Sequence, residues 1–162
     1  IAIKKQIKFL LSKIKLKNNI FVHRDFHVSN LMKYKKQLVI IDTQDALIGN
    51  KAYDLASLID DVRFKSSKEF KDQIYDYYLK LNKKKINENI FRNDFEILSV
   101  LRNMKIIGIF TRLANRDKKK IYLKLIPYTW KLIELRIENN KIFKSLKKIL
   151  DSNFSKEIRN IK

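Results

Sequence analysis

Apolar residues recur at helical spacing from the start of the chain. One face of the first segment carries Ile3, Ile7, Leu10, Leu11 and Ile14, while the lysines of this segment lie off that face. This pattern predicts an amphipathic surface helix whose apolar stripe packs on the core.

Later segments extend the helical pattern. We expect helices over residues 54–64, 68–81, 93–113, 127–137, 141–150 and 154–161. Asp54 is placed to cap the first of these helices, and Asn93 forms a capping box with Glu96. Pro127 is typical of a helix start. The lysines at 83–85 predict a solvated turn between helices.

Strand signals are confined to one region. Two short apolar segments, Asn30–Tyr34 and Gln37–Ile41, flank the pair Lys35-Lys36 and predict a β-hairpin. Residues 43–50 are expected to form a loop. Since there is no internal repeat or linker, we expect one domain over residues 1–162, mainly α with a small β-hairpin, an α+β fold.

Composition narrows the class of protein. A chain of 162 residues can bury a hydrophobic core, and its low content of glycine and proline favours a helical globular fold. No apolar run approaches the length of a membrane span, and the absence of cysteine excludes disulfides and thiolate metal sites. We therefore expect a cytoplasmic protein. Because the chain opens with Ile1 inside a helical pattern, we also expect the later part of a longer protein.

The formal net charge of +20 raises the question of a polyanionic partner. Lysines outnumber arginines 29 to 8 and are spread along the whole chain among isoleucines and asparagines. We interpret this as a compositional bias of a solvated surface, so a nucleic-acid partner is not the favoured interpretation. The positive field would still attract nucleotides and other anions.

One polar constellation interrupts the apolar pattern. Asp25 follows His23 and Arg24, Asn30 comes five residues after Asp25, and Asp42 ends the second predicted strand. A tight hairpin brings Asn30 and Asp42 to the same edge. Such an arrangement suits phosphoryl transfer, with Asp25 as the base for an attacking hydroxyl. The oxygens of Asn30 and Asp42 suit Mg²⁺ held with the phosphates of ATP.

Neighbouring polar residues are expected to support this site. His23 would brace the loop, and Asp54 would accept hydrogen bonds from the loop backbone as well as capping its helix. Arg24 is expected to pair with a carboxylate. His27 would contact substrate or nucleotide, or serve the loop itself. A zinc site on His23 and His27 is excluded because further ligands are missing.

Three sequence blocks carry a resemblance. Residues 21–32, "FVHRDFHVSNLM", resemble the catalytic loop of the aminoglycoside phosphotransferase and choline kinase superfamily, distant relatives of protein kinases. Residues 39–61, "VIIDTQDALIGNKAYDLASLIDD", and 106–130, "IIGIFTRLANRDKKKIYLKLIPYTW", are similar to blocks of bacterial anomeric N-acetylmuramate/N-acetylglucosamine kinases. Thr43 departs from the phenylalanine usual in many relatives, but the aspartate before it is kept.

The resemblance implies the C-terminal lobe of a protein-kinase-like fold. It implies Asp25 as the catalytic base, Asn30 and Asp42 as magnesium ligands, ATP as donor and the anomeric hydroxyl of an amino sugar as acceptor. Possible substrate-binding residues are Arg24, His27, Asp45, Arg112 and Arg116. With only two glycines, the chain has no glycine-rich loop, so we expect a missing N-terminal lobe or a partner chain, and little activity from this chain alone.

Two alternatives stay open. The acceptor of a kinase in this superfamily could be another small alcohol, such as an aminoglycoside, a choline-like alcohol or homoserine. The chain could also be a non-catalytic, basic module that binds nucleic acid, in which case substitution of Asp25 would leave its activity unchanged.

Overall fold

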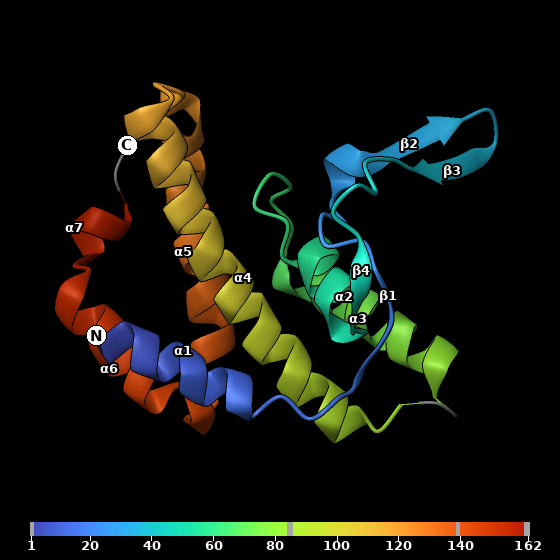
Figure 1. Ribbon diagram of the computed structural model, residues 1–162, viewed down its shortest axis with the longest axis horizontal. Helices are drawn as coiled ribbons and strands as arrows, with labels where there is room; N and C mark the ends of the chain where they lie inside the picture. The colour runs from blue at the N-terminus through green and yellow to red at the C-terminus, as the bar shows by residue number, and fades with distance from the viewer. Residues whose placement is uncertain (1, 84–85, 139, 161–162) are drawn as a thin grey trace. The chain divides into compact units, whose positions relative to one another are not determined.

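The computed structural model describes residues 2–83, 86–138 and 140–160, and it resolves the chain into two compact units. The hairpin unit is Lys15–Leu98, and the helical unit combines Ile1–Ile14 with Ser99–Lys162. The two units are described separately below, and their elements are labelled in Figure 1.

Two small antiparallel sheets lie in the hairpin unit. Strand β1 (Asn18–Val22) pairs with β4 (Leu47–Asn50), and β2 (Leu31–Tyr34) pairs with β3 (Gln37–Ile40) (Figure 1). In the second pair Leu31 lies opposite Ile40 and Tyr34 opposite Gln37, which leaves Lys35-Lys36 as a two-residue turn. Lys35 has a φ of 53°, a left-handed conformation that two-residue hairpin turns require.

The described residues of the hairpin unit also form the helices α2 (Ala52–Ile59) and α3 (Lys68–Asn82) and the first part of α4 (Glu88–Arg116). Helix α2 packs on α3. Aromatic rings fill the core, where Tyr75 meets Phe95 edge-on at 4.9 Å between centroids. The buried apolar residues of this unit are Val22, Ala52, Leu55, Ala56, Ile59, Val62, Tyr75, Phe91, Phe95, Ile97 and Leu98.

A buried carboxylate on α4 ties distant segments of the hairpin unit together. Asp94 accepts hydrogen bonds from the backbone N–H of Lys15 at 2.9 Å and of Leu16 at 2.8 Å. It also accepts one from the side-chain Nδ2 of Asn50 at 2.8 Å. Because Asn50 is the last residue of β4, Asp94 fixes the start of α4 to the β1–β4 sheet.

Helices α1, α5, α6 and α7 lie in the helical unit with the rest of α4. Their bounds are Ala2–Ser12, Ile126–Ile137, Lys144–Asn153 and Lys156–Arg159, and the 3-10 turns η2 and η3 are Lys120–Leu125 and Lys141–Phe143. Helix α1 packs on α6, and α7 on α5. The largest fully buried side chains here are Leu10, Val100, Asn103, Thr129, Leu132, Ile133, Phe143, Leu146 and Leu150. In the described parts of the chain no helix is long and apolar enough to cross a membrane.

The predicted fold class is confirmed: the chain is mainly α with a small β-hairpin. The helices predicted at 68–81 and 127–137 agree with α3 and α5 to within one residue. The α4 end at Arg116 also lies close to its expected position. Residues 84–85 of the predicted turn and the end of the last predicted helix lie outside the described residues. The single domain stays a prediction.

Several local predictions were wrong. Residues 47–50 form β4 rather than a loop, because they pair with the distant strand β1. Helix α2 starts at Ala52, not at Asp54, and the side-chain oxygen of Asn50 accepts the N–H of Ala52 at 2.9 Å. Helix α4 begins at Glu88, so the capping box at Asn93 does not form. Asn87 caps this helix instead, because its Oδ1 accepts the N–H of Ile90 at 3.1 Å.

Helix α2 also ends five residues earlier than predicted, at Ile59. Asp60 and Asp61 follow, and both side chains are fully buried. Carboxylates oppose the negative end of the helix dipole, so two successive aspartates favour an end at this point.

Candidate active site

Asp25 and Asn30 are joined by a hydrogen bond within the loop that links β1 to β2. The side-chain Nδ2 of Asn30 donates to the backbone carbonyl oxygen of Asp25 at 3.0 Å. This contact uses the amide nitrogen of Asn30, so its amide oxygen is the atom left for a ligand. The carboxylate of Asp25 lies on an exposed residue, as a base that meets a substrate must.

Asp42 belongs to the same cluster through the backbone. The N–H of Ile41 donates to the carbonyl oxygen of Asn30 at 3.1 Å, one step beyond the last β2–β3 pair. Asp42 follows directly, is exposed and has a φ of 65°. A left-handed aspartate costs conformational energy and is a common mark of a functional site. Asn30 is therefore linked to Asp25 by a hydrogen bond from its side chain, and to the residue before Asp42 by a backbone hydrogen bond.

His23 holds the two arms of the cluster together. Its ring is buried, and its Nε2 lies 2.9 Å from the carbonyl oxygen of Ile41. Because a carbonyl can only accept, the proton of this contact is on Nε2. This contact thus links the start of the loop that carries Asp25 to the residue directly before Asp42.

Asp54 fixes the loop backbone from the first turn of α2. Its Oδ2 accepts the N–H of His23 at 2.7 Å, and its Oδ1 accepts the N–H of Arg24 at 3.0 Å. Arg24 has a φ of 73°, which an unrestrained arginine rarely adopts. The paired contacts to one carboxylate stabilise this conformation. They hold the backbone directly before Asp25, which is exposed.

A second aspartate, Asp61, also binds the loop, and the sequence pattern does not single it out. Its Oδ2 accepts the N–H of Val28 at 3.1 Å, and its Oδ1 accepts the N–H of Arg63 at 3.0 Å. The sequence signal was the pair Asp60-Asp61 directly after an apolar helix, where carboxylates oppose the helix dipole.

The donor set fits a metal ion that arrives with a nucleotide. Among the described residues, no group of three or more histidines, cysteines, aspartates or glutamates could hold a metal ion alone. The cluster offers two carboxylates and one amide oxygen, all hard donors. Mg²⁺ is usually bound by one or two carboxylates together with substrate phosphates and water. Asn30 and Asp42 are the residues that would hold it.

The remaining predicted residues of the hairpin unit, Arg24, His27 and Asp45, differ in burial and in hydrogen bonding. In the part of the chain described, Arg24 does not form the expected ion pair; its Nη1 donates to the backbone oxygen of Asp45 at 3.3 Å. The His27 ring is buried, while its backbone N–H donates to the Asp25 carbonyl at 3.0 Å and its carbonyl accepts the N–H of Asn30 at 2.9 Å. The backbone of His27 thus shapes the turn, and Asp45 is exposed.

Arg112 and Arg116 belong to the helical unit. Arg112 is exposed on α4 and lines an apolar groove that also contains Ile7 and Trp130. Arg116 forms a two-point contact with Asp117, at 2.6 Å from Nε to Oδ1 and 3.0 Å from Nη2 to Oδ2. This contact raises the pKa of Arg116 and lowers the pKa of Asp117. Substrate binding by either arginine stays a prediction.

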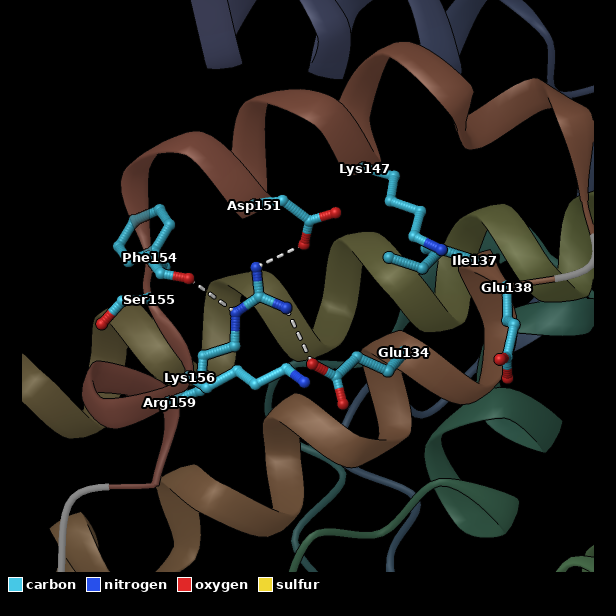
Figure 2. Close-up of a pocket in the computed structure, with 9 residues that line it drawn as sticks. All are labelled: Glu134, Ile137, Glu138, Lys147, Asp151, Phe154, Ser155, Lys156 and Arg159. Atoms are coloured by element: carbon cyan, nitrogen blue, oxygen red, sulfur yellow. Dashed lines mark hydrogen bonds and ion pairs between the residues drawn. The ribbon is translucent and has the colours of Figure 1, made fainter.

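A second hollow in the helical unit contains none of the predicted residues. It lies between α5, α6 and α7, and Arg159 occupies its centre (Figure 2). The guanidinium binds Glu134 Oε1 at 2.8 Å and Asp151 Oδ1 at 2.7 Å, and Nε donates to the carbonyl of Phe154 at 2.9 Å. These contacts use all three guanidinium nitrogens, so the hollow is a structural junction.

The model of the phosphotransferase enzyme family matches residues 3–88, a range that includes every hairpin-unit residue of the predicted site. The chain is 37% identical over 123 residues to the N-acetylmuramate/N-acetylglucosamine kinase of Neisseria meningitidis, covering 73% of this chain and 37% of the relative. It is 31% identical over 121 residues to the kinase of the same name from Caulobacter vibrioides, covering 72% and 33%. A third of that name, from Pseudomonas aeruginosa, is 32% identical over 139 residues, covering 82% and 41%.

These relatives are considerably longer than the region that they share with the chain, which spans 33% to 41% of their length. The family match covers more than half of the chain and includes the loop, the hairpin and α2. The chain belongs to the phosphotransferase enzyme family.

Proposed function

We propose that this chain supplies the catalytic loop and metal ligands of an ATP-dependent kinase that phosphorylates a sugar hydroxyl. Two hydrogen bonds of Asn30 carry the proposal. Its side chain donates to the Asp25 carbonyl, and its backbone carbonyl accepts the N–H of Ile41. They support a cluster in which Asp25 would act as the base and Asn30 and Asp42 would supply metal-binding oxygens.

Asp25 is the base in this proposal. Its carboxylate takes the proton of the acceptor hydroxyl as the oxygen attacks the terminal phosphoryl group of ATP. The bond from the terminal phosphorus to the bridging oxygen breaks, ADP leaves, and the proton moves from the sugar oxygen to a carboxylate oxygen. Asp54 and His23 keep the loop backbone in the conformation that presents Asp25. The loop is therefore arranged before substrate binds, which is how positioning contributes to rate.

Asn30 and Asp42 are the proposed ligands of Mg²⁺. When bound, the metal ion would offset the negative charge of the phosphates during transfer. The protein's part is to hold one neutral and one anionic oxygen at the edge of the β2–β3 hairpin. The His23 contact to Ile41 limits the movement of the peptide that precedes Asp42.

The proposed acceptor is the anomeric hydroxyl of N-acetylmuramate or N-acetylglucosamine. The support for it is the name shared by the three relatives, together with the two sequence blocks at 39–61 and 106–130. Such a reaction would serve cell-wall recycling, and a kinase that draws on ATP would act in the cytoplasm. Arg24, His27, Asp45, Arg112 and Arg116 are the proposed substrate contacts.

We also propose that a nucleotide-covering lobe or partner chain completes the site. The β2–β3 hairpin beside the site exposes many apolar side chains: Met32, Tyr34, Leu38, Val39, Ile40 and Ile41. A two-stranded hairpin with this much uncovered apolar surface is marginally stable in water. A second lobe closing over a nucleotide would cover it, and the chain without that lobe would have little activity.

A chimaeric enzyme tests the proposal directly. The matching segment of the Neisseria meningitidis kinase is replaced by this chain, and phosphorylation of N-acetylmuramate is measured with ATP and Mg²⁺. We expect turnover in the chimaera and its loss on Asp25→Asn, because an amide cannot take up the hydroxyl proton. Asp72→Asn, on the exposed face of α3, is the matched control and should retain activity.

Two results would contradict this assignment. Unchanged turnover in the Asp25→Asn chimaera would exclude Asp25 as the base. Rapid turnover by the isolated 162-residue chain would contradict the need for a further lobe. If the chimaera phosphorylates an aminoglycoside, a choline-like alcohol or homoserine instead, the kinase assignment stands and the acceptor is wrong.

One observation favours a second function. The residues of the helical unit comprise 21 lysines and arginines against 5 aspartates and glutamates, a net charge of +16 out of +20 for the whole chain. A concentration of positive charge is the electrostatic feature of nucleic-acid binding. Salt-sensitive binding of a DNA or RNA duplex that persists in the Asp25→Asn variant would support this alternative.

A further inference from the structure

We propose that Asp61 is a positioning residue for the magnesium ligand Asn30. This inference rests on the function proposed above. The carboxylate of Asp61 would hold the turn Val28–Asn30 from outside the loop, so that the Asn30 side chain keeps its position beside Asp25.

The Asp61 carboxylate is buried, so its hydrogen bonds matter for stability. Asp61 is 0% exposed, and a buried carboxylate is costly unless its oxygens accept hydrogen bonds. Both oxygens do so, from the N–H groups of Val28 at 3.1 Å and of Arg63 at 3.0 Å. The Arg63 guanidinium lies 3.6 Å from Oδ1 and adds a charge partner. The carboxylate is therefore fixed on both sides.

Val28 is the first residue of the 3-10 turn Val28–Asn30, whose N-terminal N–H groups need acceptors from elsewhere. His27, at the N-cap position, makes no side-chain capping hydrogen bond. Asp61 supplies the missing acceptor from a position 33 residues later in the chain. A carboxylate in this place is also favoured by the partial positive charge of the free N–H groups.

The end of the same turn carries Asn30. Its side chain bonds to the Asp25 carbonyl, and its backbone carbonyl accepts the N–H of Ile41. A shift of the turn would therefore alter the distance between Asn30 and both acidic residues of the site. Asp54 holds the loop before Asp25 and Asp61 holds it after, so one carboxylate in the first turn of α2 and one just after its end fix the loop at both ends.

The neighbouring residue Asp60 offers a matched control. It is also 0% exposed, but it pairs with the buried Lys71 of α3, at 3.3 Å from Oδ1 to Nζ. Asp60→Asn and Asp61→Asn thus remove the same charge at adjacent buried positions. In this comparison only Asp61→Asn disturbs the contact to Val28.

Binding of Mn²⁺ by the isolated chain provides the readout. Manganese chloride and ATP are titrated together into the 162-residue chain, because the proposed metal ion arrives with the phosphates, and paramagnetic broadening of the amide resonances of Asn30 and Asp42 gives the affinity. We expect Asp61→Asn to weaken Mn²⁺ binding about tenfold, the usual effect of losing a support behind a metal ligand. Asp60→Asn should change the affinity less than about twofold even if both variants lose stability.

Equal Mn²⁺ affinity in Asp61→Asn and in the unchanged chain would overturn the inference while leaving the proposed function in place. An equal loss in the two aspartate variants would also overturn it, since the effect would then be general destabilisation. If the unchanged chain shows no broadening at Asn30 and Asp42, the proposed metal site itself fails, and this inference fails with it.

Val28→Pro keeps the test decisive if Asp61→Asn does not fold. Proline removes the N–H that Asp61 accepts, is tolerated at the first position of a helical turn, and requires an extended residue before it. His27 is extended, with φ −138° and ψ 166°. We expect Val28→Pro to weaken Mn²⁺ binding about tenfold as well. Unchanged affinity in this variant would overturn the inference.

Discussion

The ring Nε2 of His23 donates a hydrogen bond to the backbone carbonyl oxygen of Ile41 across 2.9 Å. This contact joins the beginning of the loop that carries Asp25 to the end of the strand that precedes Asp42. Since His23 is buried, water cannot easily take the place of the Ile41 carbonyl at its ring. The relative position of the proposed base and the proposed metal ligand thus depends on one imidazole.

We expect His23→Phe to destabilise the chain by about 1–3 kcal/mol, the usual cost of leaving a buried polar group without its partner. Phenylalanine keeps a ring of similar shape and the edge contact to Phe26, whose centroid lies 6.1 Å away. The hydrogen bond is therefore the main change. Urea unfolding followed by circular dichroism measures the difference, and a variant as stable as the original chain would contradict the bracing role.

Asp54→Asn should cost about 2–3 kcal/mol in the free energy of unfolding, because hydrogen bonds to a charged acceptor are the stronger ones. The asparagine can accept only one of the N–H groups of His23 and Arg24 and turns its own N–H₂ towards the other. Arg24 would then lose support for its left-handed backbone.

Asp72→Asn is the control for Asp54→Asn. Asp72 pairs with Lys68 on the surface of α3, where the two side chains are 47% and 65% exposed. Exposed pairs contribute little, so we expect a change within about 0.5 kcal/mol. If urea unfolding shows that both variants lose the same free energy of unfolding, the Asp54 contacts to the loop stabilise the chain no more than an exposed ion pair does.

The hairpin and the loop could be predicted because their signals are local. Apolar segments on both sides of Lys35-Lys36 determine the register of β2 and β3, and that register brings Asn30 close to Ile41. Strand β4 could not be predicted in this way, since its partner β1 is far away in the sequence. Gly49 was the available signal: a Cβ at this position would lie 3.1 Å from the Val22 side chain, so the close approach of the strands favours glycine.

The caps and Asp61 were missed for a related physical reason. Asparagines and aspartates are frequent in this chain, and more than one stands within a turn of the starts of α2 and α4. Which of them becomes the cap depends on tertiary contacts, as for Asn50, which also binds Asp94. Asp61 meets Val28 only after the chain has folded. Local propensity cannot distinguish such a residue from a solvated carboxylate.

Arg159→Lys should destabilise the helical unit by about 1–3 kcal/mol. Lysine keeps the charge but cannot reach Glu134, Asp151 and the Phe154 carbonyl together, as the planar guanidinium does (Figure 2). It also loses the stacking of the guanidinium over Trp130, at 4.9 Å to the ring centroid.

Lys156→Ala serves as the control for Arg159→Lys, because Lys156 is exposed at the rim of the same hollow. Its loss should change the free energy of unfolding by less than about 0.5 kcal/mol. If thermal and urea unfolding give the same stability for Arg159→Lys as for the original chain, the junction between α5, α6 and α7 does not depend on the guanidinium.

Tyr75 makes the stability of the hairpin unit sensitive to alkaline pH. Burial of its hydroxyl raises the pKa of Tyr75 to about 12, against about 10 in an unfolded chain. The folded state therefore favours the neutral phenol. The stability that this preference contributes is fully present below about pH 10 and is lost as the pH rises towards about 12.

Tyr75→Phe removes this titration while keeping the ring beside Phe95 and Phe91. The free energy of unfolding of the original chain, relative to that of the variant, should fall by about 1 kcal/mol per pH unit above about pH 10.5. Tyr77→Phe, at a residue that is 63% exposed, controls for the loss of a surface hydroxyl. A constant difference between the original chain and Tyr75→Phe from pH 9 to about 11.5 would contradict the burial effect on Tyr75.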